Sequence, residues 1–392
     1  MICKNRGIPC IIMCKNNSSL LYILNGKKYR VNGHELYDKT HVSLSEAMAC
    51  TSAVLGWLSD YKMVAFLRAH CFLPLFVVKR FLPLSPKLQV GMNNLRFCDG
   101  CLWDKHSIIS SLVGLHKQGF RKAFVLSCSL EVFPHSEWWC EEKKKHRIYP
   151  NTCVFSGYLK DNFKCNYEFD DFGYATLYDD CEVDKNNPVN YCLRDMKVTV
   201  LVVGVYNNDM YYIPFDQQVY QRFSDTLDHY LPIIFEKMKV KDICNSKKAG
   251  VAIAVAGGGC RTALLGMKVM KFMNFIKNAH VVAGCSGGAW GIAMYYLYRY
   301  DTRKFVDILI ENTTKIRTRK ANMYILTISK MLEAGPLMNT AAYMIPIIKH
   351  YHFDWECIIK LLIFGENNPT WNIFPSNVVV LFPTTLLCNS RN

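Results

Sequence analysis

One pattern constrains the fold of this chain more than any other: a strand, a glycine-rich turn and a helix follow one another twice between residues 250 and 300. The apolar β-type runs predict strands at 250–256 and 280–283, and the helical periodicity predicts helices at 264–276 and 291–300. A repeated strand–turn–helix unit is typical of helices packed on a sheet. We therefore expect an α/β protein.

The composition is that of a folded and strongly basic protein. Hydrophobic residues make up 51% of the chain and charged residues 20%, which excludes a disordered chain. The formal net charge of +15 favours anionic partners, such as an acidic membrane surface or a nucleic acid, although a solvated basic surface would account for it equally well. Because the chain has no nucleic-acid reader motif and no clustered aromatic and basic stripe, we expect no nucleic-acid partner.

The 18 cysteines are scattered, and several lie within apolar runs, as Cys71 and Cys128 do. This distribution favours reduced thiols in a cytoplasmic protein. Cys98 and Cys101 form a C-x-x-C motif without a second pair and without a thioredoxin-like strand–helix context, so we expect neither a metal site nor a redox role for this motif. Residues 281–298 carry no charge and are just long enough to span a membrane, but their four glycines and one serine indicate a turn followed by a helix. We expect no signal peptide.

Residues 257–261 form the first glycine turn and read Gly-Gly-Gly-Cys-Arg. Glycine lets the backbone pack this tightly, and the helix that follows puts the N–H groups of the turn at a helix N-terminus, where an anion is stabilised. A dinucleotide fingerprint requires glycine where Thr262 stands, and a P-loop requires a lysine that this turn lacks. Two interpretations remain: an oxyanion hole, whose donors stabilise charge on a carbonyl oxygen, and a tight turn with a structural role alone.

Residues 284–288 form the second turn and read Gly-Cys-Ser-Gly-Gly, which matches G-x-S-x-G. This pattern puts a serine at a sharp strand-to-helix turn, where its hydroxyl is exposed above a sheet and its neighbours are small. The Gly-Gly-Gly-Cys-Arg turn, the helix after it and the Ala-Gly-Cys-Ser-Gly-Gly-Ala-Trp segment around Ser286 together resemble the catalytic domain of cytosolic phospholipase A2 and fungal lysophospholipase B, relatives of patatin. Trp290 favours the phospholipase branch over plant patatins.

The resemblance implies a Ser–Asp dyad that works without histidine, cofactor or metal. In this family the serine attacks an ester carbonyl after an aspartate accepts its proton, which assigns the nucleophile to Ser286. The resemblance also implies that the amides of Gly257, Gly258 and Gly259 form the oxyanion hole. Arg261 would then steady the turn or orient the phosphate of the substrate.

The aspartate of the dyad stands in an unexpected part of the chain. In the family it lies in an Asp-Gly turn well after the serine, but no Asp-Gly follows Ser286. The aspartates that do follow it, considered as alternatives, are Asp301, Asp307 and Asp354. Upstream, Asp99 and Gly100 lie between an expected strand at 95–98 and an expected helix at 108–117, which resembles the base-bearing turn of the family. Asp99 is therefore the predicted base.

The order of the two parts is reversed relative to the family. Residues 1–240 resemble the second half of a catalytic domain and residues 249–392 the first half, with 241–248 as a linker. The first part departs from the family at Cys101, which replaces a glycine, and at Lys105, which replaces an asparagine. This order fits either a circular permutation, in which both parts build one site, or a fragment of a tandem protein. The fragment would have two half-sheets with exposed strand edges that favour dimer swapping.

We therefore expect an α/β, patatin-like fold: a mostly parallel central sheet flanked by helices, with an irregular insertion at 134–195. The expected activity is hydrolysis of acyl esters of phospholipids or lysophospholipids, by a cytoplasmic protein that associates peripherally with an anionic membrane surface. The alternative is an inactive phospholipase-like fragment that binds a lipid or a partner. In a single site built from both parts, the carboxylate of Asp99 must lie within hydrogen-bond reach of the hydroxyl of Ser286.

Overall fold

The structure is a computed structural model in which both glycine turns and the Asp99 segment are described. The described residues are 7–14, 20–24, 27–30, 44–52, 87–90, 93–129, 163–169, 175–183, 193–204, 217–245, 249–272, 279–298, 301, 304, 307–308, 311–312, 360–365 and 369–387.

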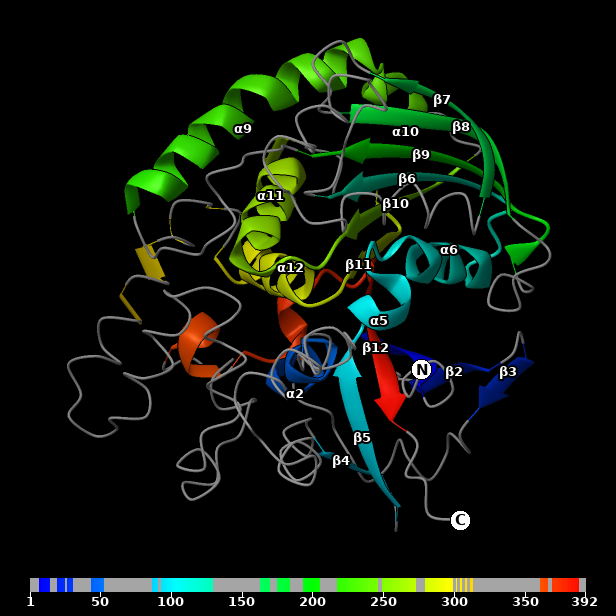
Figure 1. Cartoon of the computed structure of the whole chain (residues 1–392), viewed down its shortest axis with the longest axis vertical. Coiled ribbons are helices and arrows are strands. Elements are labelled where there is room, and N and C mark those ends of the chain that lie inside the picture. Colours follow the sequence, from blue (N-terminus) through cyan, green and yellow to red (C-terminus); the bar gives the residue numbers. More distant parts are fainter. Residues whose placement is uncertain are drawn as a thin grey trace, which may run out of the picture.

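A single twelve-stranded sheet runs through the described part of the chain (Figure 1). Its strands follow the order β3-β2-β1-β12-β11-β10-β6-β9-β8-β7, while β5 pairs with β12 and β4 with β5. The strands are β1 (Gly7–Cys14), β2 (Leu20–Leu24), β3 (Lys27–Arg30), β4 (Lys87–Val90), β5 (Asn93–Asp99), β6 (Lys122–Cys128), β7 (Phe163–Phe169), β8 (Ala175–Val183), β9 (Lys197–Val203), β10 (Gly250–Val255), β11 (Val281–Gly284) and β12 (Val379–Leu387). Both the 1–240 and the 249–392 parts therefore contribute strands to one sheet.

The centre of the sheet is parallel and its two sides are antiparallel. Strands β12, β11, β10, β6 and β9 pair in parallel with their neighbours in this series. The strands on either side of this series pair antiparallel. Strand β10 is buried along its whole length, as expected of a central parallel strand that is covered on both faces. The prediction of an α/β protein with parallel central strands is confirmed, and the antiparallel additions on both sides extend it.

Helices cover both faces of the central sheet. The helices are α2 (Leu44–Thr51), α5 (Cys101–Asp104), α6 (Ile108–Lys117), α9 (Gln217–Lys237), α10 (Val240–Asn245), α11 (Gly259–Phe272) and α12 (Gly287–Leu297), together with a π-helical turn (Lys360–Phe364) and a 3₁₀ turn (Trp371–Ile373). Helix α6 packs on one face, whereas α2, α9, α11 and α12 belong to the core of the other face (Figure 1).

The core is divided into two layers because successive side chains of a strand point to opposite faces. In β10, Ile253 and Val255 join the layer under α11 and α12, while Ala252 and Ala254 join the layer under α6. The small alanines let α6 approach the sheet closely, and the branched residues fill the wider space on the other side.

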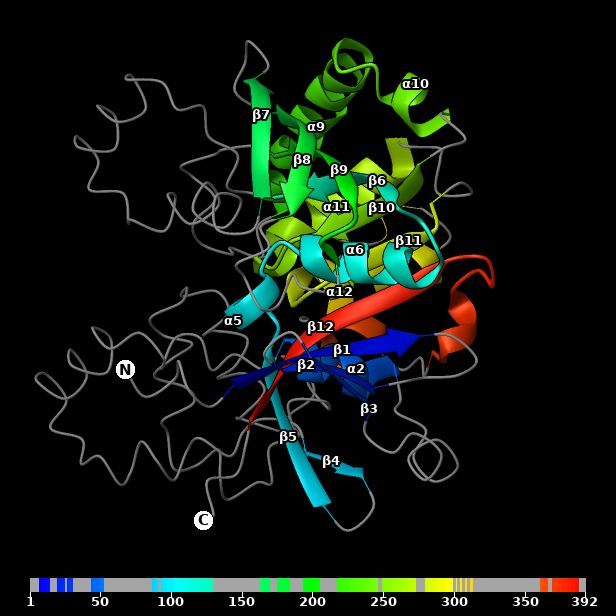
Figure 2. The ribbon, with the colours of Figure 1, turned by 90° about the vertical axis from the view of Figure 1, so that its right-hand side faces the viewer.

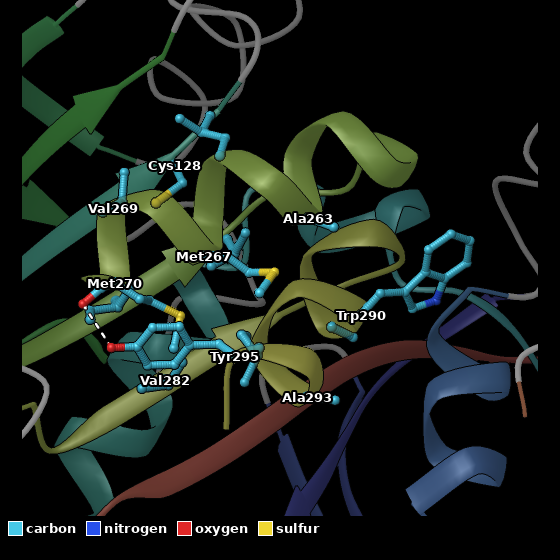
Figure 3. Packing of buried hydrophobic residues seen from close by; sticks show 14 of the residues in the cluster. Cys128, Ala263, Met267, Val269, Met270, Val282, Trp290, Ala293 and Tyr295 are labelled. Carbon is cyan, nitrogen blue, oxygen red and sulfur yellow. Dashed lines mark hydrogen bonds between the residues drawn. The ribbon is translucent and has the colours of Figure 1, made fainter. Parts of the chain in front are cut away.

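Helices α11 and α12 pack closely against each other, as Figure 3 shows. Met267 and Met270 of α11 lie near Tyr295 of α12, whose hydroxyl donates a hydrogen bond of 3.2 Å to the carbonyl oxygen of Met270. Trp290 extends from α12 away from these residues (Figure 3). This pair of helices carries the two glycine turns at its N-terminal ends, so its packing determines how the turns face each other.

Strand β12 presents one edge to two different strands. Near its start it pairs in parallel with β11, with Leu381 opposite Ala283, and near its end it pairs antiparallel with β5, with Thr384 opposite Asp99. Strand β1 occupies the other edge over the same length, and Figure 2 shows it beside β12. Strands β11 and β5 therefore run toward each other along a single edge. Their C-terminal ends meet there, which brings the segments after Ala283 and around Asp99 together.

Residues 134–195 are less irregular than their composition suggests. Strands β7 and β8 lie within this range and extend the sheet beyond β9 as an antiparallel pair. The prediction of an irregular insertion is therefore wrong for 163–169 and 175–183. In β8 the core face carries apolar side chains such as Cys181, while the other face carries exposed acidic residues such as Glu182. A strand with one solvated face has this mixed composition, which does not stand out as an apolar run.

Several predicted boundaries shift in the structure. Helix α6 has the predicted bounds, 108–117. Helices α11 and α12 begin earlier than predicted, at Gly259 and Gly287, because the last glycines of each turn already belong to the first helical turn. The expected linker at 241–248 begins with the short helix α10.

The cysteines of the described segments are in two states. Cys50, Cys101, Cys128 and Cys285 are free thiols, whereas Cys181 is disulfide-bonded. The expectation of reduced cysteines is therefore wrong at Cys181, because composition does not reveal which sulfur atoms lie within bonding distance. None of the described helices combines the length and the apolar character that crossing a bilayer requires.

Candidate active site

Ser286 lies at a strained elbow between β11 and α12. Its φ of 51° and ψ of −124° are unfavourable for a residue with a Cβ atom. The neighbouring glycines have no room for a side chain: a Cβ on Gly287 would lie 2.0 Å from the carbonyl oxygen of Gly259, and one on Gly284 would lie 2.6 Å from Cδ1 of Ile292. The strand–turn–helix arrangement that G-x-S-x-G predicts is therefore present.

Asp99, the last residue of β5, lies beside Ser286. The hydroxyl of Ser286 donates a hydrogen bond to the carboxylate of Asp99. The N–H of Cys101 also donates to Oδ1 of Asp99, at 2.8 Å. Both side chains of the predicted dyad are largely shielded from solvent, since Asp99 is 6% exposed and Ser286 9%. The structure thus brings together two side chains that the sequence places in different parts of the chain.

Burial raises the pKa of the Asp99 carboxyl above its ordinary value of 3.8. Hydrogen bonds from Cys101 and Ser286 and the positive charge of Lys105 oppose this rise, since each favours the carboxylate. Lys105 thus adds a positive charge near the carboxylate. An aspartate with a raised pKa accepts a proton more readily than an exposed one, which suits a general base.

The glycine turn lies against the elbow, but its first amide is already engaged. The N–H of Gly257 donates a hydrogen bond of 2.9 Å to the carbonyl oxygen of Lys105. Gly257 is therefore not a free oxyanion donor, contrary to what the resemblance implied. Within the described segments, the N–H groups of Gly258 and Gly259 have no hydrogen-bond acceptor. These two glycines have φ of 155° and 68°, a region that disfavours other residues, and they lead into α11.

Arg261 lies in the first turn of α11 and is partly buried. The first turn of α11 contains no acidic residue. The positive end of the helix dipole therefore lies beside Gly258 and Gly259. This local positive potential would stabilise negative charge on a ligand.

The carbonyl oxygen of Thr51, at the end of α2, joins the two halves of the dyad. It accepts hydrogen bonds from the N–H of Gly100 at 3.1 Å and from the N–H of Ser286 at 3.2 Å. The hydroxyl of Thr51 donates in turn to the carbonyl oxygen of Pro383 in β12. Sequence reasoning missed Thr51, because a main-chain acceptor leaves no signal in residue type.

The carbonyl oxygen of Lys105 joins the glycine turn to the elbow in a similar way. Besides the N–H of Gly257, it accepts a hydrogen bond of 3.1 Å from the thiol of Cys285, the residue before Ser286. Cys101 also packs here, since a Cβ on Gly257 would lie 2.1 Å from its Sγ. The C-x-x-C motif could have drawn attention to Cys101, but its contact with Cys285 depends on the fold.

Metal ligands are not gathered at this site. Within the segments that the structure describes, no three His, Cys, Asp or Glu side chains come together in a way that could bind a metal ion. Two of the alternatives to Asp99, Asp301 and Asp307, lie in the described part of the chain, and there the side chain of Ser286 is hydrogen-bonded to Asp99 and not to either of them. The third alternative, Asp354, lies outside the described residues.

The chain was compared with known proteins, and it matches no protein-family model, no curated protein and no solved structure. The functional argument therefore depends on the geometry of the elbow, the carboxylate and the glycine turn.

Proposed function

We propose that this protein is a serine acyl hydrolase of the patatin-like type, which cleaves acyl esters of phospholipids or lysophospholipids through a dyad of Ser286 and Asp99. The observation that carries the proposal is the hydrogen bond from the hydroxyl of Ser286 to the buried carboxylate of Asp99. A serine on a strained elbow with a carboxylate acceptor has the two groups that nucleophilic acyl transfer needs.

In the acylation step, the oxygen of Ser286 attacks the ester carbonyl as its proton passes to Asp99. The free N–H groups of Gly258 and Gly259 stabilise the negative charge that develops on the carbonyl oxygen, helped by the N-terminal end of α11. Asp99 then donates its proton to the leaving alcohol, and the acyl group remains on Ser286. The raised pKa of Asp99 suits both tasks, because this carboxyl has to accept a proton and release it again.

In the deacylation step, Asp99 accepts a proton from a water molecule that attacks the acyl group on Ser286. The same two glycine amides stabilise the second tetrahedral intermediate. As this intermediate collapses, Asp99 returns the proton to the oxygen of Ser286 and the fatty acid leaves, which restores the hydrogen bond between the two side chains. The cycle needs only groups of this chain and water.

The phospholipid class of substrate is supported by the resemblance of both turns to phospholipases and by the local charge. The N-terminus of α11 provides positive potential next to the glycine turn, where the phosphate of a lipid would be attracted, and Arg261 of its first turn would orient that phosphate. The net charge of +15 would favour approach to an anionic membrane surface. A neutral ester would gain stabilisation only at its carbonyl oxygen, because it has no phosphate to be attracted.

A fluorophosphonate probe tests the proposal directly, because it reacts with an activated serine. We expect the probe to label the wild-type protein at Ser286 and Ser286→Ala to lose both labelling and hydrolysis of a lysophospholipid. Ser224→Ala, a change in α9 and outside the site, is the matched control and should label like the wild type. Absence of labelling at Ser286 in the folded wild-type protein would favour the inactive, lipid-binding alternative.

Binding to vesicles tests the membrane part of the proposal. Exposed charges are screened beyond about 8 Å at physiological ionic strength, so binding through charge weakens steeply as salt is added. We expect the protein to bind vesicles that contain phosphatidylserine and to dissociate from them as the salt concentration rises. Binding that is independent of salt would mean that apolar insertion, and not the net charge, drives association.

A further inference from the structure

The Sγ atoms of Cys101 and Cys285 lie 3.5 Å apart, in the segments that carry the dyad. Cys101 follows the Asp99–Gly100 turn, and Cys285 precedes Ser286. Both sulfur atoms lie around Gly257, since a Cβ on that glycine would be 2.1 Å from Sγ of Cys101 and 3.3 Å from Sγ of Cys285. The two thiols thus join the three segments of the site, and the proposed hydrolysis uses neither of them.

The geometry needs only a small change to form a bond. A disulfide has an S–S length of about 2.05 Å, so the two sulfur atoms would have to approach each other by roughly 1.5 Å. The backbones are already close here: a Cβ on Gly100 would lie 3.2 Å from Cβ of Cys285. Both cysteines are free thiols, and Cys101 is the one of the four described free cysteines that is not fully buried.

We propose that Cys101 and Cys285 form a reversible disulfide when a peroxide is present, and that this disulfide switches the site off. The sulfur of Cys101 first attacks hydrogen peroxide, which gives a sulfenic acid on Cys101 and one water. The thiol of Cys285 then attacks that sulfur and displaces a second water. In total, two thiols are oxidised, one peroxide is reduced, and a reductant that supplies two electrons and two protons reverses the change.

The effect on the site follows from the contacts that these two residues make. To reach Cys101, the sulfur of Cys285 must give up its hydrogen bond to the carbonyl oxygen of Lys105, which also accepts the N–H of Gly257. Cys101 also donates its N–H to Asp99. The disulfide would therefore shift the carboxylate and the glycine turn relative to Ser286. A displacement of about 1 Å in a catalytic group can lower a rate roughly 10²-fold.

The contact with Cys285, burial and the negative charge of Asp99 together raise the pKa of Cys101 well above its ordinary value. Cys101 is therefore protonated near neutral pH, and because the thiolate is the nucleophile, oxidation is slow. Because the oxidation of Cys101 is slow, the site would stay reduced at a low peroxide concentration. The disulfide would form only during sustained exposure to peroxide.

Peptide mapping of the full chain tests the disulfide without any activity measurement. The protein is treated with hydrogen peroxide, its remaining thiols are alkylated, and it is digested without reductant. We expect a linked peptide pair that contains Cys101 and Cys285, lighter by two hydrogens than the separate peptides, which disappears after reduction. The buried thiol of Cys128 should remain alkylatable on unfolding and serves as the internal control. A map in which other cysteines are oxidised while these two stay unlinked would overturn the inference.

Two further readouts test the switch itself. Hydrogen exchange of the Gly257 segment should be faster in the oxidised protein, because the shift of the glycine turn weakens the hydrogen bond from the N–H of Gly257 to the carbonyl oxygen of Lys105. This readout does not depend on catalysis. Fluorophosphonate labelling of Ser286, which depends on the proposed function, should fall roughly 10²-fold on oxidation and return with reductant. In Cys285→Ser, neither readout should respond to peroxide. Unchanged exchange in the linked protein refutes the switch, whereas absent labelling in the reduced protein refutes only the proposed function.

Discussion

The main-chain N–H of Ser286 donates a hydrogen bond of 3.2 Å to the carbonyl oxygen of Thr51. The same oxygen accepts the N–H of Gly100, the residue after Asp99. The C-terminal end of α2 therefore holds the two segments that carry the proposed dyad at a common point. Because the N–H of Ser286 is already engaged in this hydrogen bond, it is not available to an oxyanion. The donors proposed for the oxyanion therefore come from the glycine turn.

The side chain of Thr51 should contribute to stability and to the geometry of the site, because its hydroxyl anchors the C-terminal end of α2 to β12. Thr51→Val removes the hydroxyl that donates to the carbonyl oxygen of Pro383 and leaves that buried acceptor without this donor. We expect the free energy of unfolding to fall by about 1–3 kcal/mol. Labelling of Ser286 should also slow, because the anchored carbonyl oxygen moves. Thr51→Ser keeps the hydroxyl and should recover most of both quantities in denaturant titrations and labelling assays. A loss of stability in Thr51→Ser without a loss in Thr51→Val would show that the methyl group, and not the hydrogen bond, is important.

A glycine at position 257 should be required for full stability, because the sulfur atom of Cys101 leaves no room for a side chain there. Gly257→Ala puts a methyl group 2.1 Å from Sγ of Cys101, and such overpacking typically destabilises by about 1–3 kcal/mol. Cys101→Ala removes that sulfur atom. We therefore expect the double variant to be more stable than the sum of the two single effects predicts, with a coupling of roughly 1 kcal/mol in a double-mutant cycle. Additive effects would mean that the strain arises elsewhere in the turn.

The backbone strain at Ser286 can be measured by comparing two variants that both lack the hydroxyl. Ser286→Ala retains a Cβ at φ 51°, whereas Ser286→Gly removes it. Strain of this kind costs roughly 1–3 kcal/mol, and glycine loses about 0.5–1 kcal/mol more conformational entropy on folding than alanine. We expect Ser286→Gly to be the more stable of the two variants by about 1 kcal/mol in urea titrations. If Ser286→Ala were the more stable variant, the elbow would not be strained in solution.

Sequence reasoning found those features of the site that are local in the chain. Ser286 and its elbow are encoded by a run of five residues, and the apolar strand and helix on either side have the expected period. Asp99 has no such local signal, and only the resemblance to a base-bearing turn suggested it. The sheet explains why it reaches Ser286: β5 and β11 share one edge of β12, a relation between three segments that no single stretch of sequence encodes.

Other parts of the structure were missed for physical reasons that differ. The contact of Gly257 with Lys105 joins main-chain atoms, so residue type could not reveal it. The polar composition of the insertion predicts an irregular segment, although β8 buries some of its residues and exposes others such as Glu182. A short strand with one solvated face is easily confused with a loop, because few residues are available to show the alternation of apolar and polar side chains.

The buried carboxyl of Asp99 should make the stability of the protein depend on pH. Burial raises its pKa above the ordinary value of 3.8, so the folded protein binds this proton more tightly than the unfolded chain does. The contribution of Asp99 to stability is therefore greatest below pH 3.8 and decreases as the pH rises through the folded-state pKa. Asp99→Asn removes this titration. We expect the variant and the wild type to have similar stabilities in acid, and the variant to become relatively more stable toward neutral pH.

The same variant should lose activity, since an amide cannot accept the proton of Ser286. Removing a general base lowers a rate roughly 10²–10⁴-fold, to be measured as ester hydrolysis at neutral pH. Asp195 provides a control of opposite sign: although burial opposes the change, a backbone hydrogen bond and the charges of His116 and Arg121 lower its pKa. Asp195→Asn should therefore be destabilising above pH 3.8, with the effect disappearing as the pH falls, and it should leave hydrolysis intact. A pH-independent stability difference for Asp99→Asn would show that the carboxyl of Asp99 is not held in the buried site beside Ser286.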